Sequence, residues 1–531
     1  MINWVAFTVF IFFFVVVTVL GFVAARWRRG NLDLINEWGL AGRRFGTIVT
    51  WFLLGGDLYT AYTFIAVPGA MFGLGVLNGW FAVPYTVLVY PIVFILMPRF
   101  WSVCKKRGYV TTSDFVKDRF GSKTLAFAVA LTGIVATLPY IALQMYGIQI
   151  SLAAIGVPLS VSIGSLQIDL PLLIAFLIVA AYTYTSGLRA PAMIALVKDT
   201  MIFITLIAIL VVIPSQLGGF GAIFGAANAK HAANPTTFFV FLNPKQYWAY
   251  VTLALGSALA LFLYPHSLTA VLSSNSKNVV KRNTALLPIY SMMLGLLALT
   301  GYMAIAAHVN LTTGPLAKFG SNAAVPALIN QEFPSWFAGF AFAAISIGAL
   351  VPASVMSIAA ANLFTRNIFK EYLNPNASER AETSVAKWAS LILKFGAVLF
   401  IIYIPTTQVI NFQLLGGIWI LQTLPAVFLG LYTNWFNRWA LLIGWLVGEV
   451  LGTVYFYQAG LKSVYTITIG NFSFPAMYIA FSMIVVNLVL AIILTPIFNV
   501  IGLRSGRDVT AQTDYDLEEA MPIEVGREEL G

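Results

Sequence analysis

The sequence consists of apolar runs of about 20 residues that are separated by short polar breaks. A helix of that length spans the hydrocarbon core of a bilayer. No water in that core satisfies backbone groups, so each run must be helical. Hydrophobic residues make up 60% of the 531 residues and charged residues only 9%, whereas an ordinary soluble domain has about 25% charged residues. We therefore predict an all-α, polytopic membrane protein.

About thirteen transmembrane spans can be assigned from these runs. They cover approximately residues 3–25, 47–75, 78–98, 124–146, 169–186, 192–214, 248–271, 284–308, 336–363, 387–408, 411–432, 439–459 and 473–498. The polar stretches 215–247 and 309–335 are predicted to be loops or short surface helices. Residues 1–498 would then form one transmembrane domain, and residues 499–531 an acidic tail that we expect to be mobile.

The placement of basic residues predicts the orientation. Nearly all of them lie at one set of span ends, as at residues 26–29, 43–44 and 99–123. The opposite ends carry only Lys230, Lys245, Lys318 and Lys462. Because basic loops stay in the cytoplasm, we expect an external amino terminus and a cytoplasmic carboxyl terminus in the cell membrane. This placement also explains the net charge of +10 without a nucleic-acid partner.

Two spans contain glycine and proline where a regular helix would not. The second span reads LLGGDLYTAYTFIAVPGAMFG, and the seventh contains Gly256 and Pro265. Interrupted spans five helices apart are typical of inverted-repeat transporters, with the site at the breaks. The repeats would cover about residues 47–214 and 248–432. For the seventh span a simpler explanation stays open, since glycine and proline are common in membrane helices.

Asp57 lies near the middle of the second span, where an ionisable group costs about 2.5–3.5 kcal/mol on insertion scales and indicates function. Thr60 adds a hydroxyl nearby. The carbonyls of a helix break can bind a cation, and its exposed amino ends favour an anionic group. The alternative is that Asp57 only caps the broken helix.

Lys198 and Asp199 are adjacent in the sixth span. Neighbouring helical residues project about 100° apart, so we expect them not to pair with each other. Lys198 would instead meet Asp57 or the free carbonyls of the second span. The alternative is that its amine reaches the cytoplasmic interface.

Five further polar residues lie in apolar spans. For Lys394 we favour an amine that reaches the cytoplasmic interface, and for Glu449 a pairing at a helix contact. His266 is placed at the cytoplasmic end of the seventh span, as a packed or interfacial residue. Gln144 and Gln422 could each bind a substrate oxygen or form a hydrogen bond to a neighbouring helix, and both roles stay open.

Several segments, in this order, resemble the sodium/solute symporter family. They are the break ending in PGAMFG, the stretches TTSDFVKDRFGSK and TSGLRA, and ANLFTRNIFKEYL at the end of the ninth span. The resemblance covers most of the chain. It implies a LeuT-type core of five plus five helices, with one extra amino-terminal helix and two extra carboxyl-terminal helices. The details GGDLYTAYTF, LVPASVMSIAAANLFTRN and LQTLPA are similar to the branch that takes up monocarboxylates, and alanine in some members.

The resemblance also implies a sodium site, and there the chain departs from the family. Sodium-coupled members hold the ion between carbonyls of the second span and two hydroxyls of the ninth. The matching positions here are the carbonyls of Gly56, Tyr59 and Gly348, with Val351 and Pro352 in place of the hydroxyls. Valine and proline side chains offer no oxygen ligand. Ser354 is near but would need a shift in register.

We therefore expect the Lys198 ammonium to lie where sodium would, so that a proton replaces the ion. Burial disfavours the charged form of a lysine and makes its protonation changeable. Sodium coupling through other oxygens is the alternative.

The expected function is a secondary active symporter for a small monocarboxylate or amino acid, driven by protons in preference to sodium. The alternative is sodium-coupled uptake of proline or another solute. A channel or a membrane-embedded enzyme is less favoured than either kind of symporter. The predicted substrate residues are Gly55, Gly56, Asp57, Thr60, Tyr140, Gln144 and Gln422. The predicted coupling residues are Gly56, Tyr59, Lys198, Asp199, Gly348 and Ser354. Beyond a possible sodium ion we expect no cofactor and no obligate protein partner, since a single cysteine, Cys104, excludes a disulfide and no nucleotide or metal motif appears.

Overall fold

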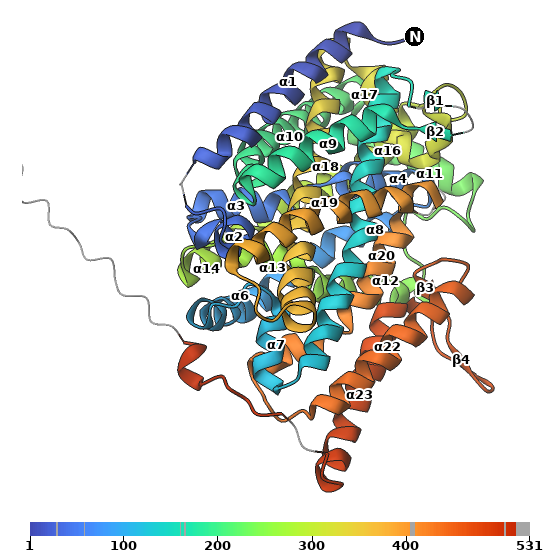
Figure 1. Cartoon of the computed structure of the whole chain (residues 1–531). Helices are drawn as coiled ribbons and strands as arrows, with labels where there is room; N and C mark the ends of the chain where they lie inside the picture. Colours follow the sequence, from blue (N-terminus) through green and yellow to red (C-terminus); the bar gives the residue numbers. More distant parts are fainter. Residues whose placement is uncertain are drawn as a thin grey trace, which may run out of the picture.

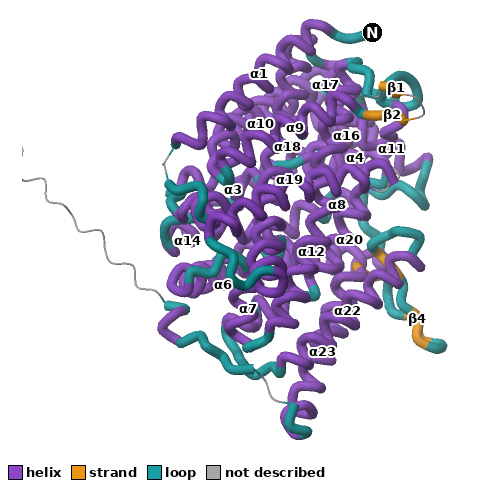
Figure 2. Tube along the Cα trace, in the orientation of Figure 1, coloured by secondary structure: helices purple, strands orange, loops and turns teal. Residues whose placement is uncertain are grey.

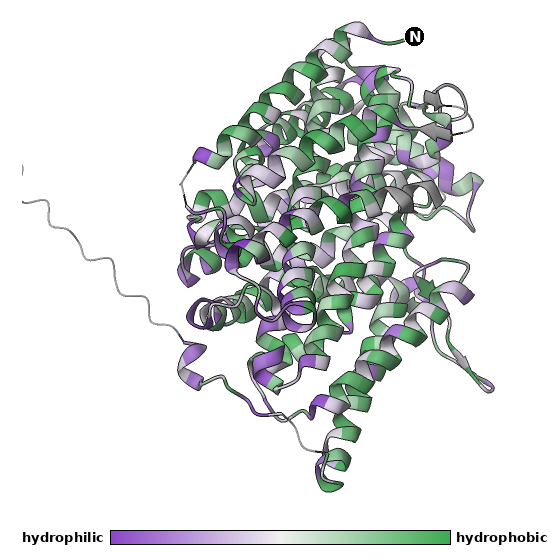
Figure 3. Cartoon of the chain, viewed as in Figure 1, coloured by the Kyte–Doolittle hydropathy of each residue, from purple (hydrophilic) through white to green (hydrophobic). Residues whose placement is uncertain are grey.

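The computed structural model describes residues 1–27, 30–57, 59–159, 161–163, 166–403, 409–503 and 506–516. Long helices make up this part of the chain, and strands occur only as short hairpins in connections (Figures 1 and 2). Hydrophobic residues cover the long helices, whereas hydrophilic residues gather in the connections and around the C-terminal segment (Figure 3).

The first half of the chain contains α1 (Trp4–Val23), α2 (Ile35–Leu40), α3 (Thr47–Gly56), the π-helical turn η3 (Tyr62–Ala66), α4 (Val67–Gly73), α5 (Val76–Gly79), α6 (Ala82–Arg107), α7 (Thr112–Phe120), α8 (Lys123–Ile155), β1 (Val161–Ile163), β2 (Leu166–Ile168), α9 (Leu170–Ser186), α10 (Arg189–Gln216), α11 (Gly219–Ala233) and α12 (Tyr247–Leu261). The second half contains α13 (Pro265–Leu272), α14 (Lys277–Leu286), α15 (Pro288–Ala298), α16 (Thr300–Ala306), α17 (Ala324–Glu332), α18 (Ser335–Phe364), the π-helical η6 (Thr365–Leu373), α19 (Glu379–Tyr403), α20 (Val409–Leu421), α21 (Leu424–Val427), η8 (Leu429–Leu431), α22 (Arg438–Gln458), β3 (Val464–Tyr465), β4 (Thr468–Ile469), β5 (Phe472–Ser473), β6 (Met477–Tyr478) and α23 (Ile479–Val500). The pairs β1–β2, β3–β6 and β4–β5 are all antiparallel.

The thirteen predicted spans each overlap a helix or a set of consecutive helices, although the end of the span predicted at 387–408 lies outside the described residues. By length and hydropathy alone, eight described helices could cross a membrane, or up to ten if each bent pair is one span. The polar stretches that we predicted as loops or surface helices contain α11 and α17.

α18 lies at the centre of the bundle, and its most apolar 18-residue window is entirely buried. It packs against α8, α1, α10 and α19. Its sequence is rich in alanine, glycine and serine, for example AFAAISIGALVPASVMSIAAA. Small side chains let neighbouring helix backbones approach closely in a membrane, where the hydrophobic effect does not drive helix association.

Both predicted breaks are present, and the structure adds one that we missed. The second span leaves the α-helix after Gly56 and resumes through η3 into α4. The seventh span bends by 46° between α12 and α13. The missed break is a 45° bend between α20 and α21, where Gln422 and Thr423 precede Pro425. A proline cannot donate the next helical hydrogen bond, which is why the helix stops there.

Part of the tail that we expected to be mobile is packed against the bundle. Residues 506–516 lie along α6 and α7, where Asp508 bonds to Arg119 and Asp514 bonds to Arg107. The expectation of mobility is therefore corrected for these residues. The prediction did not consider that acidic residues of the tail can pair with basic residues at the helix ends.

Candidate functional site

The Lys198 ammonium lies at the break of the second span. Its Nζ donates to the carbonyl of Gly56 at 2.6 Å and to the carbonyl of Tyr59 at 3.2 Å. Both Lys198 and Asp199 are completely buried. α3 ends at Gly56, and the last carbonyls of a helix have no amide of the next turn to bond, so they can accept from another donor.

Our expectation that Lys198 and Asp199 do not pair is wrong. Asp199 Oδ1 lies 3.0 Å from the lysine Nζ. Both groups lie against Gly56 at the end of α3, and this shared contact brings them together despite the angular separation of adjacent residues. The Tyr290 hydroxyl on α15 donates to the other carboxylate oxygen at 3.1 Å.

Asp57 pairs with the seventh span rather than with Lys198. Its Oδ2 accepts a hydrogen bond from Ser267 at 2.9 Å and lies 3.4 Å from His266 Nε2. His266 is fully buried, and its ring packs edge-on against Tyr140. The packed position that we favoured for it is confirmed, and the α12–α13 break just before Pro265 sets His266 beside Asp57 of the first break.

The backbone amides at the first break are bonded to side-chain oxygens in this conformation. Ala61 N–H donates to Gln144 Oε1 at 3.0 Å, Thr60 N–H to Thr63 Oγ1 at 3.0 Å and Tyr62 N–H to Thr60 Oγ1 at 3.1 Å. Gln144, for which we left two roles open, therefore bonds a neighbouring helix here, at the backbone that we expected to hold an anion.

A small cavity lies between the two breaks and α20. Its lining residues are Tyr62, Tyr85, Tyr140, Ser257, Ala260, Leu261, Tyr264, Gln413, Leu414, Gly417 and Tyr478. Tyr140 shares a hydrogen bond with Thr60, which joins the cavity wall to the first break. The cavity volume of about 20 Å³ holds about one water molecule and leaves no room for a three-carbon acid, and we call this conformation the closed state.

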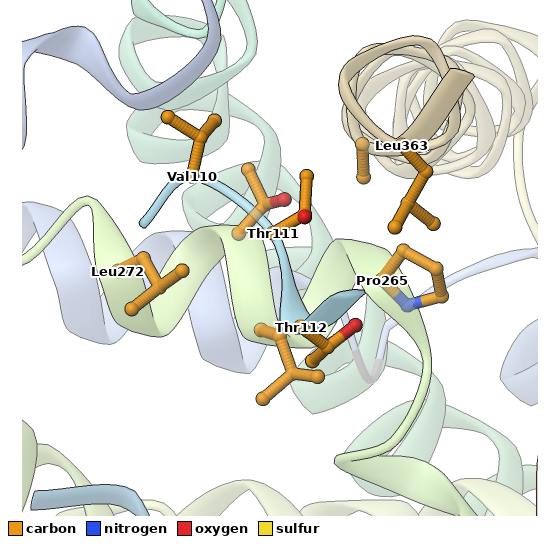
Figure 4. Close-up of a pocket in the computed structure, with 9 residues that line it drawn as sticks. Val110, Thr111, Thr112, Pro265, Leu272 and Leu363 are labelled. Carbon is orange, nitrogen blue, oxygen red and sulfur yellow. The ribbon is translucent and has the colours of Figure 1, made fainter. Parts of the chain in front are cut away.

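A second cavity, of about 10 Å³, is lined by Pro265 and by residues of α13, α18 and the start of α7. Figure 4 shows Val110, Thr111 and Thr112 facing Leu272, Pro265 and Leu363 across it. α13 is thus packed closely against α18 and the start of α7, with room for about one water molecule.

The residues around Lys198 do not fit a sodium ion. The ammonium already occupies the Gly56 and Tyr59 carbonyls, and Val351 and Pro352 bring no oxygen side chains from α18. Ser354 Oγ donates instead to its own helix, at the Leu350 carbonyl. Gly348 does face this region, since a Cβ built on it would lie 3.8 Å from the Tyr59 carbonyl oxygen.

Three other predicted residues lie elsewhere. Gln422 accepts from Asn487 on α23 at 3.3 Å, so it bonds a neighbouring helix and makes no hydrogen bond to the described residues of the first break. Glu449 accepts from Thr132 on α8 at 3.1 Å, the helix contact that we favoured for it. Lys394 is only 2% exposed and donates to Ser390, so our expectation of an interfacial amine is wrong.

Our sequence reasoning missed several residues of the site. These are Tyr290, Ser267 and the tyrosines around the cavity. Tyrosine and serine are common in apolar spans, where they also form packing contacts and interfacial belts, so their presence alone does not indicate a site. The one available signal was PHSL directly after the seventh-span break, since a polar pair at a break faces the opposite break in an inverted repeat.

A model of the sodium:solute symporter family matches residues 38–448. The chain is 52% identical to a monocarboxylate transport permease protein of Rhizobium johnstonii, over 93% of this chain and 96% of that one. It is 31% identical to the uncharacterized symporter YodF of Bacillus subtilis, over 91% of each chain. The solved structure of a substrate-bound, outward-open Na⁺-coupled sialic acid symporter matches 93% of this chain and 98% of that one, with a TM-score of 0.72 and 15% identity. That likeness confirms the predicted LeuT-type helical fold.

Proposed function

This chain belongs to the sodium:solute symporter family, and we propose that it imports a small monocarboxylate of the pyruvate, lactate or acetate type together with protons. The family and the named relatives are transporters, not enzymes. The substrate class follows from the relative of 52% identity, which is named a monocarboxylate transport permease. In this proposal the amino terminus is outside the cell and the carboxyl terminus is in the cytoplasm.

One observation carries the choice of protons. The Lys198 ammonium occupies the two break carbonyls, at 2.6 and 3.2 Å, that the resemblance assigns to sodium. Hydrogen bonds from a charged donor are about twice as strong as neutral ones. A protonated Lys198 can therefore tie α10 to the broken span as a bound cation would.

Loss of that proton has a defined consequence in this geometry. A neutral amine loses the charge-assisted bonds to Gly56 and Tyr59 and leaves Asp199 as a buried, unpaired carboxylate. The contact between α10 and α3 is thereby weakened. In the proposed cycle the lysine binds a proton on the outer side and releases it inside, and this contact forms and breaks with each turnover.

The substrate carboxylate is assigned to the amides of Thr60, Ala61 and Tyr62. In the closed state these amides donate to the oxygens of Thr63, Gln144 and Thr60. An entering carboxylate would replace one of these acceptors with a charged one, and the backbone there carries the partial positive charge of a helix start.

The test is uptake of labelled lactate into proteoliposomes in sodium-free buffer with an inward proton gradient. We expect saturable accumulation in the wild type. The double variant Lys198→Met with Asp199→Asn removes both charges of the buried pair together, and we expect it to exchange substrate but to lose acceleration by the proton gradient.

Lys394→Met is the matched control, because it removes the other buried lysine and should keep proton-driven uptake. Transport that stops completely without sodium would overturn the proton proposal and favour sodium coupling. Transport of proline but of no monocarboxylate would overturn the substrate assignment.

A further inference from the structure

Two buried oxygens in the wall of the cavity between the breaks have no hydrogen-bond partner among the residues that the structure describes. They are Ser257 Oγ on α12 and Gln413 Oε1 on α20. Both residues line the same cavity. More than nine in ten buried polar groups in proteins are hydrogen-bonded, so two unpaired oxygens at one cavity indicate that something else pairs with them.

The backbone around Gln413 is held in place by tyrosines from two other elements. The Tyr264 hydroxyl donates to the Gln413 carbonyl at 3.4 Å, and the Tyr478 hydroxyl donates to the Leu414 carbonyl at 2.7 Å. These bonds fix the start of α20 while leaving the Gln413 side-chain oxygen unpaired. The side chain therefore projects from a fixed backbone, which favours a ligand-binding role.

The two groups have complementary chemistry. A serine hydroxyl can donate a hydrogen bond, and a glutamine side-chain carbonyl can only accept one. A ligand hydroxyl between them would accept from Ser257 and donate to Gln413, which satisfies both oxygens. A ligand carbonyl would accept from Ser257 and, with the Gln413 amide turned over, from its NH₂ group, whereas a methylene would leave both groups unpaired.

We infer that Ser257 and Gln413 bind the oxygen at C2 of a 2-hydroxy or 2-oxo monocarboxylate, and so favour such a substrate over its unsubstituted analogue. This inference rests on the proposed function, in which the carboxylate lies at the first break. Tyr140 connects that break to this cavity through its bond to Thr60.

The expected selectivity follows from leaving buried groups unpaired. Sites built to bond a substrate hydroxyl reject the analogue that lacks it far more strongly than apolar pockets reject a missing methylene. We expect lactate and pyruvate both to bind better than propionate, with about tenfold or more between lactate and propionate.

The experiment measures displacement of labelled lactate from the purified full-length protein by unlabelled lactate, pyruvate and propionate. It compares the wild type with Ser257→Ala and Gln413→Leu. In each variant we expect lactate affinity to fall about tenfold and propionate affinity to stay the same or improve, so that the ratio between them collapses. Gln413→Met serves if the leucine variant does not fold, as judged by thermal unfolding.

Gln458→Leu is the matched control, because this glutamine is exposed at the end of α22 and its loss should change neither affinity. An unchanged lactate-to-propionate ratio in both cavity variants would overturn the inference and leave a bound water as the partner of the two oxygens. Failure of the wild type to bind any of the three acids would instead overturn the proposed function, and the inference with it.

Discussion

A lysine buried in a membrane protein is stabilised only by the groups that its ammonium meets, and the two buried lysines here meet different groups. Lys198 contacts two carbonyls and the Asp199 carboxylate. Lys394 donates to the Ser390 hydroxyl and forms no ion pair with any residue that the structure describes. The first lysine neutralises a charge that would otherwise be buried alone, whereas the second is itself the uncompensated group.

The same substitution should therefore change stability in opposite directions at these two positions. Lys198→Met leaves Asp199 buried and unpaired, and removing one partner of a buried pair costs about 3–5 kcal/mol. Lys394→Met replaces an uncompensated amine with an apolar side chain of similar length, and should raise the unfolding temperature. Thermal unfolding of both variants in detergent measures the two shifts, and two shifts of the same sign would contradict this account.

At the scale of one element, the break in the second span depends on two glycines, Gly55 and Gly56, which have no side chains. A Cβ built on Gly56 would lie 2.7 Å from Lys198 Nζ and 2.9 Å from Asp199 Oδ2, closer than real Cβ contacts. A Cβ on Gly55 would lie 2.2 Å from the Tyr290 ring. The two glycines thus let α10 and α15 reach the carbonyl ends of α3, which a uniform helix of larger residues would keep away.

Gly56→Ala should displace the lysine amine from its two carbonyls and abolish proton-driven uptake at an expression level near that of the wild type. Gly46→Ala, at the start of the same helix, is the control, because nothing lies within 4 Å of a Cβ built there. Lactate uptake under an inward proton gradient is the measurement. Equal loss of uptake in both variants would point to a general effect on helix α3.

At the scale of the whole molecule, the C-terminal segment 506–516 ties together parts of the bundle that are distant in sequence. Tyr515 is only 2% exposed, and the guanidinium groups of Arg99 and Arg119 lie 4.5 and 5.4 Å from its ring centre. The same two arginines donate to the carbonyls of Leu431 and Gly430, at the end of the eleventh predicted span. The segment therefore stabilises the arginines that connect α6 and α7 to η8.

This attachment should depend on pH. Burial raises the pKa of Asp514, but the Ala511 amide and the side chains of Arg107 and Lys106 outweigh that effect, so its pKa lies below the ordinary value of 3.8. A lowered carboxyl pKa contributes stability that is complete above the unfolded value and is lost as the pH falls through the folded value. The segment should stay attached at pH 7 and detach below about pH 4.

A dye on Gln512→Cys reports this attachment, since the natural Cys104 is buried and should not be labelled. Its fluorescence anisotropy should fall as the segment is released in acid. Asp514→Asn should lower the anisotropy already at pH 7. A signal that is independent of pH and of this substitution would mean that the segment is not held by Asp514.

The sequence by itself determined that this chain is a helical membrane protein, because apolar runs of bilayer length allow no other structure without water. It also determined where the first break lies, because Gly55, Gly56 and Asp57 interrupt the apolar run of the second span. Only the tertiary structure decided which charges meet. Asp57 pairs with His266 and Ser267 rather than with Lys198, and Lys198 pairs with its own neighbour. The physical reason is that side-chain partners depend on how helices from two halves of the chain cross, and hydropathy periods carry no information about that crossing.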